Sequence, residues 1–223
     1  EVAQGFGATQ SESISLERFE RDLTEVDSFV PDTNFKYHAA GFWVHAAIEA
    51  AKTLRIEHSL QPTDISHIQI MVDEAHLSIV NKQEPSTGLE AKFSLRFAVA
   101  MALHSVDTAG IESFNDDIVL DPALVATRDK AEVSAFDEPT TEARVTITTI
   151  DGRELSHQAN VAIPLRDLDL QWQKLEAKFR SLVEPLVGFG TTNQLISWCR
   201  DLENRDDLSD LWANLRAEFG VDC

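Results

Sequence analysis

Residues 145–163 read VTITTIDGRELSHQANVAI, and this stretch decides the expected fold. Two segments with strand character, 144–150 and 155–163, flank the dipeptide Asp151-Gly152. An Asp-Gly pair in this setting is a strong hairpin signal, because a type I′ turn needs positive φ at both central residues. The sequence therefore predicts two antiparallel strands joined by a type I′ turn.

Two further segments predict strands of the same sheet. Within residues 64–73, Ile68, Ile70 and Val72 alternate with their neighbours, as in a strand with one buried face. A shorter strand is expected at 133–136. The strands do not alternate regularly with helices, which argues against a doubly wound parallel sheet. We therefore expect an α+β fold, with helices on one face of a small, mainly antiparallel sheet.

The helices that would cover this sheet have distinct patterns. Residues 39–54, AAGFWVHAAIEAAKTL, predict a helix that is buried on several sides. After a loop at 85–88, Thr87 and Glu90 have capping-box spacing and are expected to begin a second helix. Its apolar stripe would comprise Leu89, Phe93, Phe97, Ala100 and Met101. A short helix is also expected within 107–122.

Both ends of the chain are expected to be helical. Near the start, Ser13 or Ser15 would cap a helix whose apolar face comprises Leu16, Phe19 and Leu23. The last third predicts a helix broken by Gly188 and Gly190, then helices around 195–202 and 208–219. The apolar face of the first of these comprises Trp172, Leu175, Phe179, Leu182 and Leu186. The expected organisation is an opening segment and helix over 1–30, a small α+β domain over 31–165, and a helical segment over 166–223.

Composition excludes several classes of protein. The 223 residues include 38 Asp and Glu against 19 Lys and Arg, a net charge of −19. A phosphate backbone would be repelled by such a field, so nucleic acid is not an expected partner. No apolar run reaches the ~20 residues of a membrane span, so no membrane is expected either. Two cysteines, Cys199 and Cys223, suit a reducing compartment. We expect a cytoplasmic protein, or a mitochondrial one if the source is eukaryotic.

One cluster of residues that could take part in binding or catalysis contains Lys36, His38 and His45 around the small residues Ala39, Ala40 and Gly41. Small residues leave room for a ligand, and a histidine near its usual pKa can move protons at neutral pH. The alternative is a hydrogen-bonded core histidine at His45, with Ala and Gly serving helix packing. The residues alone leave both interpretations open.

The second cluster is the helix start at Thr87, with Lys92 and Arg96 downstream. Free N–H groups at a helix N-terminus, together with a hydroxyl cap, would suit a carboxylate. The alternative is an ordinary cap whose Lys92 and Arg96 face solvent. The common nucleotide-binding, serine-hydrolase and zinc-protease motifs do not occur in the sequence.

Three segments of the chain resemble the MmgE/PrpD family, which includes 2-methylcitrate dehydratase, cis-aconitate decarboxylase and iminodisuccinate epimerase. The segments are FKYHAAGFWVHAAIEAAKTLR at 35–55, EPSTGLEAKFSLRFAVAMAL at 84–103, and the hairpin at 145–163 followed by KLEAKFRSL at 174–182. The resemblance extends from about residue 5 to the C-terminus. The middle segment is long and specific.

The resemblance implies a two-domain organisation. Family members are much longer and insert a small α+β domain into a large all-helical domain, to which the final helices return. This chain, which begins at Glu1 without Met, would be the small domain plus the returning helices. Its expected partner is the missing N-terminal helical domain, or another chain that supplies it. The isolated chain is expected to be inactive. The family is commonly dimeric, so a homodimer is an expected assembly.

The resemblance also implies a reaction. We expect part of a carbon–oxygen lyase of the dehydratase type that acts on a small di- or tricarboxylic acid such as 2-methylcitrate. The alternatives are an epimerase, an isomerase or a cis-aconitate decarboxylase of the same family, a degenerate, non-catalytic homologue, or a small partner subunit that acts only by association. The family's chemistry implies no metal and no cofactor. His45 would be catalytic, whereas Lys36, Thr87 and Lys92 would bind substrate.

Three positions depart from the family pattern. Gly41 falls where relatives carry Cys or His, and Phe97 falls where a tyrosine is usual. Both positions would line the substrate site. Residues 164–168 replace an expected Gly- and Pro-rich loop. A lost imidazole or thiol and a lost hydroxyl would remove donors to a substrate, which motivates the non-catalytic alternative.

Overall fold

The computed structural model describes residues 15, 17, 33–209 and 211. The described residues from Asn34 onward belong to one compact unit, to which the account below refers. The helix expected around Phe19 lies outside the described residues, and the one expected over 208–219 lies almost wholly outside them. Within the described part of the chain, no helix combines the length and apolarity that a membrane span requires.

The predicted mainly antiparallel sheet is confirmed. Four strands lie in the order β2-β1-β3-β4. They comprise Ala131–Ala135 (β2), Ile65–Val72 (β1), Glu142–Thr149 (β3) and Glu154–Asn160 (β4). β1 runs parallel to β2 and antiparallel to β3, which is antiparallel to β4. The predicted alternation in β1 is also confirmed, because Ile68, Ile70 and Val72 are fully buried.

The β3–β4 hairpin forms as predicted, but its turn is not type I′. Gly152 has φ 85°, whereas Asp151 is not among the positive-φ residues. The Gly152 N–H donates to the Thr149 carbonyl (3.0 Å), and the Thr149 N–H donates to the Arg153 carbonyl (2.9 Å). The loop is therefore one residue longer than a two-residue turn, and only its last residue must adopt the left-handed conformation.

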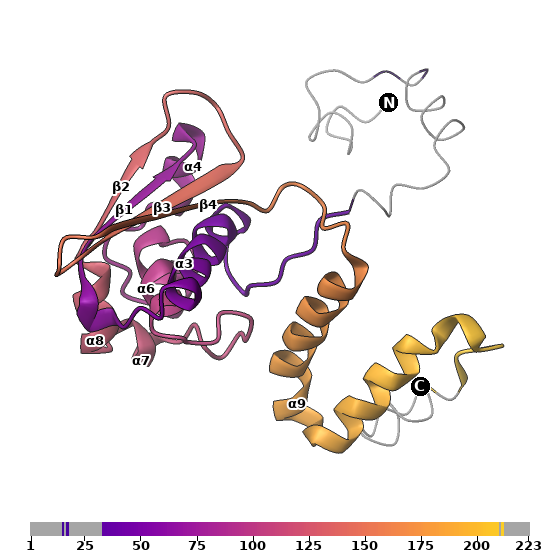
Figure 1. Cartoon of the computed structure of the whole chain (residues 1–223). Coiled ribbons are helices and arrows are strands. Elements are labelled where there is room, and N and C mark those ends of the chain that lie inside the picture. The colour runs from indigo at the N-terminus through magenta and orange to yellow at the C-terminus, as the bar shows by residue number, and fades with distance from the viewer. Residues whose placement is uncertain (1–14, 16, 18–32, 210, 212–223) are drawn as a thin grey trace, which may run out of the picture. The chain divides into compact units, whose positions relative to one another are not determined.

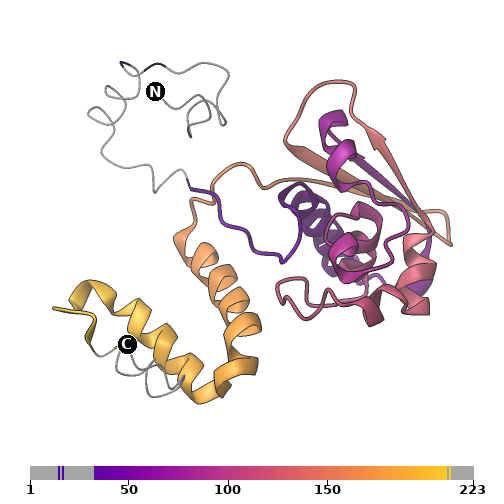
Figure 2. The same cartoon turned by 180° about the vertical axis from the view of Figure 1, so that it is seen from behind.

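Helices cover one face of the sheet, as expected. α3 (His45–Glu57) packs against β3 and β4, and α6 (Leu95–Leu103) packs on α3 and reaches β2. Both helices lie on the same side of the sheet in the two views (Figures 1 and 2). α8 (Pro122–Arg128) packs on α6, and the short α7 (Asp116–Val119) confirms the helix expected within 107–122. Two further short elements are η3 (Pro62–Asp64) and α4 (Glu74–Val80).

Two predicted helices have different bounds. The segment 39–54 begins with a 3₁₀ turn, η2 (Phe42–Val44), and becomes α-helical only at His45. The prediction of one helix with a continuous stripe from Leu89 to Met101 is wrong. A short α5 (Gly88–Ala91) ends before Ser94, whose Oγ accepts a hydrogen bond from the Phe97 N–H (3.2 Å) and begins α6. Leu89 is therefore 68% exposed rather than part of the core.

The C-terminal helix α9 (Leu168–Arg200) consists of two arms. Gly188 has φ 77° and ψ 167°, which interrupts the helix and confirms the predicted break at this residue, whereas Gly190 is helical. A salt bridge of 2.8 Å joins Arg200 of the second arm to Glu176 of the first. An apolar groove between the arms is lined by Trp172, Leu175, Phe179 and Ile196. η4 (Leu202–Asn204) follows.

Candidate functional site

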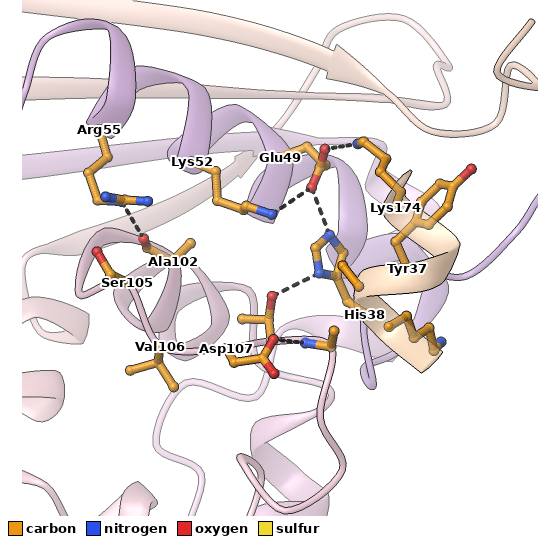
Figure 3. Close-up of a pocket in the computed structure, with 14 residues that line it drawn as sticks. Tyr37, His38, Glu49, Lys52, Arg55, Ala102, Ser105, Val106, Asp107 and Lys174 are labelled. Atoms are coloured by element: carbon orange, nitrogen blue, oxygen red, sulfur yellow. Dashed lines mark hydrogen bonds and ion pairs between the residues drawn. The ribbon is translucent and has the colours of Figure 1, made fainter. Parts of the chain in front are cut away.

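A cavity of about 250 Å³ gathers most of the chemically interesting side chains (Figure 3). Its walls come from the loop before η2, from α3, from the loop after α6 and from the first arm of α9. His38, Glu49, Thr108, Lys174 and Lys178 are among the lining residues. These residues come from four separate segments, so the cavity exists only in the folded chain.

Helix α3 contributes one charged face to the cavity. Glu49, Lys52 and Arg55 recur every three residues, a spacing that places them along the same side of a helix. The Lys52 Nζ lies 3.4 Å from Glu49 Oε1, and the Arg55 Nε donates to the Ala102 carbonyl (3.1 Å). The second contact anchors the Arg55 side chain to α6 beside the cavity.

His38 lies at the centre of a polar network, although only 3% of its surface is exposed. Its Nδ1 lies 2.8 Å from Thr108 Oγ1, and its Nε2 lies 3.0 Å from Glu49 Oε1. The Ala39 N–H donates to the Thr108 carbonyl (2.8 Å), which ties the two loops together next to the imidazole. Both nitrogens of this buried ring are therefore satisfied.

The charge states of this network follow from burial and contacts. Burial lowers the pKa of His38 and outweighs the opposing effect of its Glu49 hydrogen bond. Burial alone would raise the pKa of Glu49, but hydrogen bonds from His38 and Lys174 hold that pKa far below its usual value. At neutral pH the network therefore contains a neutral imidazole and a carboxylate.

Cations from α9 complete the cavity. The Lys174 Nζ donates to the second carboxylate oxygen of Glu49, and the Lys178 Nζ donates to the Lys36 carbonyl. Burial, with a smaller contribution from the Lys36 charge, lowers the pKa of Lys178. Asp107 adds one carboxylate to the wall and accepts a hydrogen bond from the Ala109 N–H (2.9 Å). The charged side chains that line the cavity therefore include more cations than carboxylates, although the net charge of the chain is −19.

His45, the predicted catalytic residue, lies behind His38 and is not among the residues that line the cavity. It is 1% exposed, its Nε2 donates to the Ala40 carbonyl (3.3 Å), and its ring meets that of His38 edge-on at 4.9 Å between centroids. Burial, together with the nearby His38, lowers the pKa of His45 to about 3. Lys36 is exposed at the edge of the same region.

The structure does not bring the other predicted site residues to the cavity. The Gly41 N–H donates to the Lys92 carbonyl (2.8 Å), and a Cβ at Gly41 would lie 3.2 Å from the Phe93 ring. The Lys92 Nζ lies 6.0 Å from the centre of the Phe114 ring. Phe97 is fully buried in the core. Substrate contacts at Gly41, Lys92 and Phe97 stay predictions.

Thr87 serves as a helix cap. Its Oγ1 accepts a hydrogen bond from the Glu90 N–H (3.2 Å), which is one half of the predicted capping box. The other half differs, because the Glu90 carboxylate accepts from the Ser86 N–H and hydroxyl (2.8 Å each) rather than from the Thr87 backbone. Substrate binding by Thr87 also stays a prediction.

Sequence reasoning did not assign Glu49, Thr108 or Lys174 to the site. Two of them had a signal in the sequence, because Glu49 follows His45 by one helical turn and Lys174 begins the segment KLEAKFRSL. Thr108 had none, since it lies in a loop without periodicity. Among the described residues, no cluster of three or more His, Cys, Asp or Glu could hold a metal ion.

Comparison with known proteins places this chain in a family. Residues 38–202 match the model of the MmgE/PrpD C-terminal domain. The chain belongs to the MmgE/PrpD family. It is 25% identical over 189 residues to cis-aconitate decarboxylase of Homo sapiens, an alignment that covers 82% of this chain and 39% of the relative. The MmgE/PrpD chain thus spans well under half the length of that curated relative.

Proposed function

We propose that this MmgE/PrpD chain forms the carboxylate-binding part of a metal-independent lyase that acts on a small di- or tricarboxylic acid. The observation that carries the proposal is the gathering of Lys52, Arg55, Lys174 and Lys178 around one cavity in a strongly acidic chain. Asp and Glu outnumber Lys and Arg by 38 to 19 in this chain, so a cluster of four cations beside the buried His38 favours an anionic ligand.

The size and chemistry of the cavity support a small acid. Its volume of about 250 Å³ lies just below the ~300–1,000 Å³ of drug-sized ligand sites. Charge-assisted hydrogen bonds from Lys and Arg would orient the carboxylates. Fixed carboxylates would in turn hold the reacting carbon next to the proton-transfer groups. Lys178 lines the cavity and makes no contact with Glu49, so it is the cation best suited to a binding test.

Dehydration of a 2-methylcitrate-like acid is the reaction we propose first. In this reaction a base removes a proton next to a carboxylate while an acid protonates the departing hydroxyl. Decarboxylation is the second candidate, and the relationship to human cis-aconitate decarboxylase favours it. In both cases we propose that an all-helical domain, or a partner chain that carries one, completes the site. We further propose that the complete protein is a dimer.

The test uses the full-length product of the gene. Purified protein is incubated with 2-methylcitrate, cis-aconitate and iminodisuccinate, and products are identified by NMR. We expect turnover of at least one acid. Lys178→Met should raise the KM for that acid about tenfold, a loss of ~1.4 kcal/mol of binding. The matched control is Lys82→Met, because Lys82 pairs with Glu90 away from the cavity.

Two results would contradict the proposal in different ways. Absence of turnover with all the acids, while they still bind, would indicate the non-catalytic homologue. Equal KM values for Lys178→Met and the Lys82→Met control would show that the cavity does not bind the carboxylates.

A further inference from the structure

Thr108, His38 and Glu49 form a continuous line of hydrogen bonds at the cavity. The Oγ1 of Thr108 lies 2.8 Å from His38 Nδ1, and His38 Nε2 lies 3.0 Å from Glu49 Oε1. All three residues line the cavity, and Figure 3 shows the contact between His38 and Glu49. A hydroxyl, an imidazole and a carboxylate in this order match the arrangement in which a base activates a hydroxyl and a carboxylate orients the base.

The carboxylate fixes where the protons are. An ionised carboxylate can only accept hydrogen bonds, so His38 Nε2 must carry a hydrogen and donate it to Glu49. In a neutral imidazole the other nitrogen, Nδ1, is then an acceptor. The Thr108 hydroxyl must therefore donate its own hydrogen to His38 Nδ1. This leaves the lone pairs of Thr108 Oγ1 free to accept a proton from a molecule in the cavity.

The surrounding charges maintain these states. Glu49 also accepts hydrogen bonds from Lys174 and Lys52, which keep it ionised. Besides Glu49, the groups whose charges act on His38 are Lys52 and Lys174, and both favour the neutral ring. The ring of His45 meets that of His38 at 4.9 Å and is itself kept neutral by burial. His38 is therefore a neutral base at neutral pH, as proton removal requires.

We propose that Thr108 and His38 are the proton-transfer groups of the cavity, with Glu49 as their positioning residue. This inference rests on the proposed function. A proton leaves the substrate carbon next to a carboxylate and bonds to Thr108 Oγ1, while the Thr108 hydroxyl proton moves to His38 Nδ1. The electron pair of the C–H bond stays on the substrate, whose carboxylates face the cavity cations. Glu49 stabilises the imidazolium. The reverse transfer through Thr108 then delivers the proton to the departing hydroxyl, which leaves as water while the C–H electron pair forms the double bond.

This relay assigns proton transfer to different residues from the sequence prediction. His45 has its Nε2–H committed to the Ala40 carbonyl and does not line the cavity. Thr108 and His38 do line it, and their side chains already lie within hydrogen-bond distance of each other (2.8 Å). In this proposal His45 packs against the ring of His38 and is not the base of the relay.

The first test measures the tautomer of His38 without reference to turnover. Histidine-selective ¹⁵N NMR on the full-length protein, assigned with His38→Gln, should show Nε2 protonated and Nδ1 unprotonated at pH 7. In Glu49→Gln both neutral tautomers of His38 should be populated, because an amide can donate as well as accept a hydrogen bond. A protonated Nδ1 in the wild-type protein would overturn the relay, since Thr108 could not then pass its proton to His38.

The second test measures turnover of the acid on which the protein is active. Thr108→Val should lower kcat by about 100-fold, the size of one general acid–base contribution, with KM changed much less. Thr108→Ser should restore most of the rate. Glu49→Gln should shift the pH dependence of kcat. The control is Thr127→Val, because Thr127 is a buried threonine that lies 2.8 Å from a histidine, His104, outside the cavity.

The outcomes separate the two proposals. Wild-type kcat in Thr108→Val overturns the relay while the lyase proposal stands, and so does an equal loss in Thr127→Val. Absence of turnover in the wild-type protein with every acid overturns the proposed function. In that case the NMR measurement alone decides whether Thr108 donates to His38.

Discussion

Glu49 and His38 are joined by a contact of 3.0 Å between Oε1 and Nε2. This contact connects the loop before η2 to a charged side chain of α3. The same carboxylate accepts hydrogen bonds from Lys52 on α3 and Lys174 on α9. One side chain therefore connects three segments of the chain. Glu49 therefore contributes to the position of the imidazole, to the charge of the cavity and to the contact between α3 and α9.

The Glu49–Lys174 pair should be energetically coupled. Lys174→Met and Glu49→Gln should each lower the free energy of unfolding, and the double variant should lose about 1 kcal/mol less than the sum. The physical reason is that each single change leaves a partly buried partner without its counterpart, since 21% of the Glu49 side chain and 31% of the Lys174 side chain are exposed. Urea unfolding at pH 7 measures the cycle.

The control cycle uses Asp151 and Arg153, whose side chains are each more than half exposed. Solvent screening should reduce their coupling to near zero. Strict additivity at Glu49 and Lys174 would show that the contact contributes nothing to the fold.

His45 should make the protein sensitive to acid. Its pKa is lowered from 6.5 to about 3 in the folded state, so the unfolded chain binds more protons between these values. The contribution of His45 to stability is therefore complete above pH 6.5 and is lost as the pH falls toward 3. The free energy of unfolding should drop by up to about 1.4 kcal/mol per pH unit in this window from His45 alone.

Urea titrations at a series of pH values test this slope. His45→Gln keeps a donor for the Ala40 carbonyl but cannot be protonated, so its slope should be shallower than that of the wild-type protein. His58→Gln, at an exposed position, controls for the loss of a histidine. Identical slopes for His45→Gln and the wild type would contradict the assignment.

The elements that the sequence predicted well are those with a strong local pattern. Ile68, Ile70 and Val72 alternate because one face of β1 is buried, and this period is visible in the residues themselves. Asp151-Gly152 marks the hairpin for a similar reason. The turn type was missed because loop length depends on strand register, here the pairing of Thr148 with Glu154.

Other features depend on competition between local signals. Ser94 begins α6, but the sequence already offered Thr87 as a helix start, and the apolar period continues across the break. The hydroxyl of Ser94 donates to the Lys82 carbonyl (2.6 Å) as well as accepting from the Phe97 N–H. The first of these contacts is tertiary, so residue spacing alone does not predict it.

The cavity itself could be predicted only in part. His38 and Lys178 lie in segments that resemble the family, but Thr108 meets His38 across 70 residues of sequence and Lys174 meets Glu49 across 125. No local period encodes such contacts. The predicted residues Thr87 and Phe97 lie within the most specific family segment, yet one caps a helix and the other fills the core.

Phe97→Tyr should destabilise the fold rather than restore a substrate contact. Phe97 is fully buried and does not line the cavity, so the added hydroxyl would enter an apolar core. A buried hydroxyl without a partner costs about 1–3 kcal/mol. Thermal and urea unfolding should show this loss, with little change in KM.

The control for this substitution is Phe35→Tyr, at a ring that is 37% exposed, where the hydroxyl can reach water. An increase in turnover by Phe97→Tyr without loss of stability would instead support a substrate contact at this position.

Gly188 and Gly190 offer a matched pair for testing the break in α9. Beyond the adjoining backbone, a Cβ at either position would meet no atom within 4 Å, so contacts with the rest of the described chain do not distinguish the two substitutions. Only the backbone differs. Gly188 has φ 77° and ψ 167°, a combination that is essentially restricted to glycine, whereas Gly190 is helical.

Gly188→Ala should therefore cost about 1–3 kcal/mol, and Gly190→Ala should stabilise the second arm by about 0.5–1 kcal/mol. Urea unfolding measures both values. If the kink is relieved and the helix continues through residue 188, far-ultraviolet circular dichroism should show a higher helix content. A straightened α9 would separate Arg200 from Glu176, so Glu176→Gln should cost less in the Gly188→Ala background than in the wild type. Equal effects of the two glycine substitutions would show that the break does not depend on the conformation of Gly188.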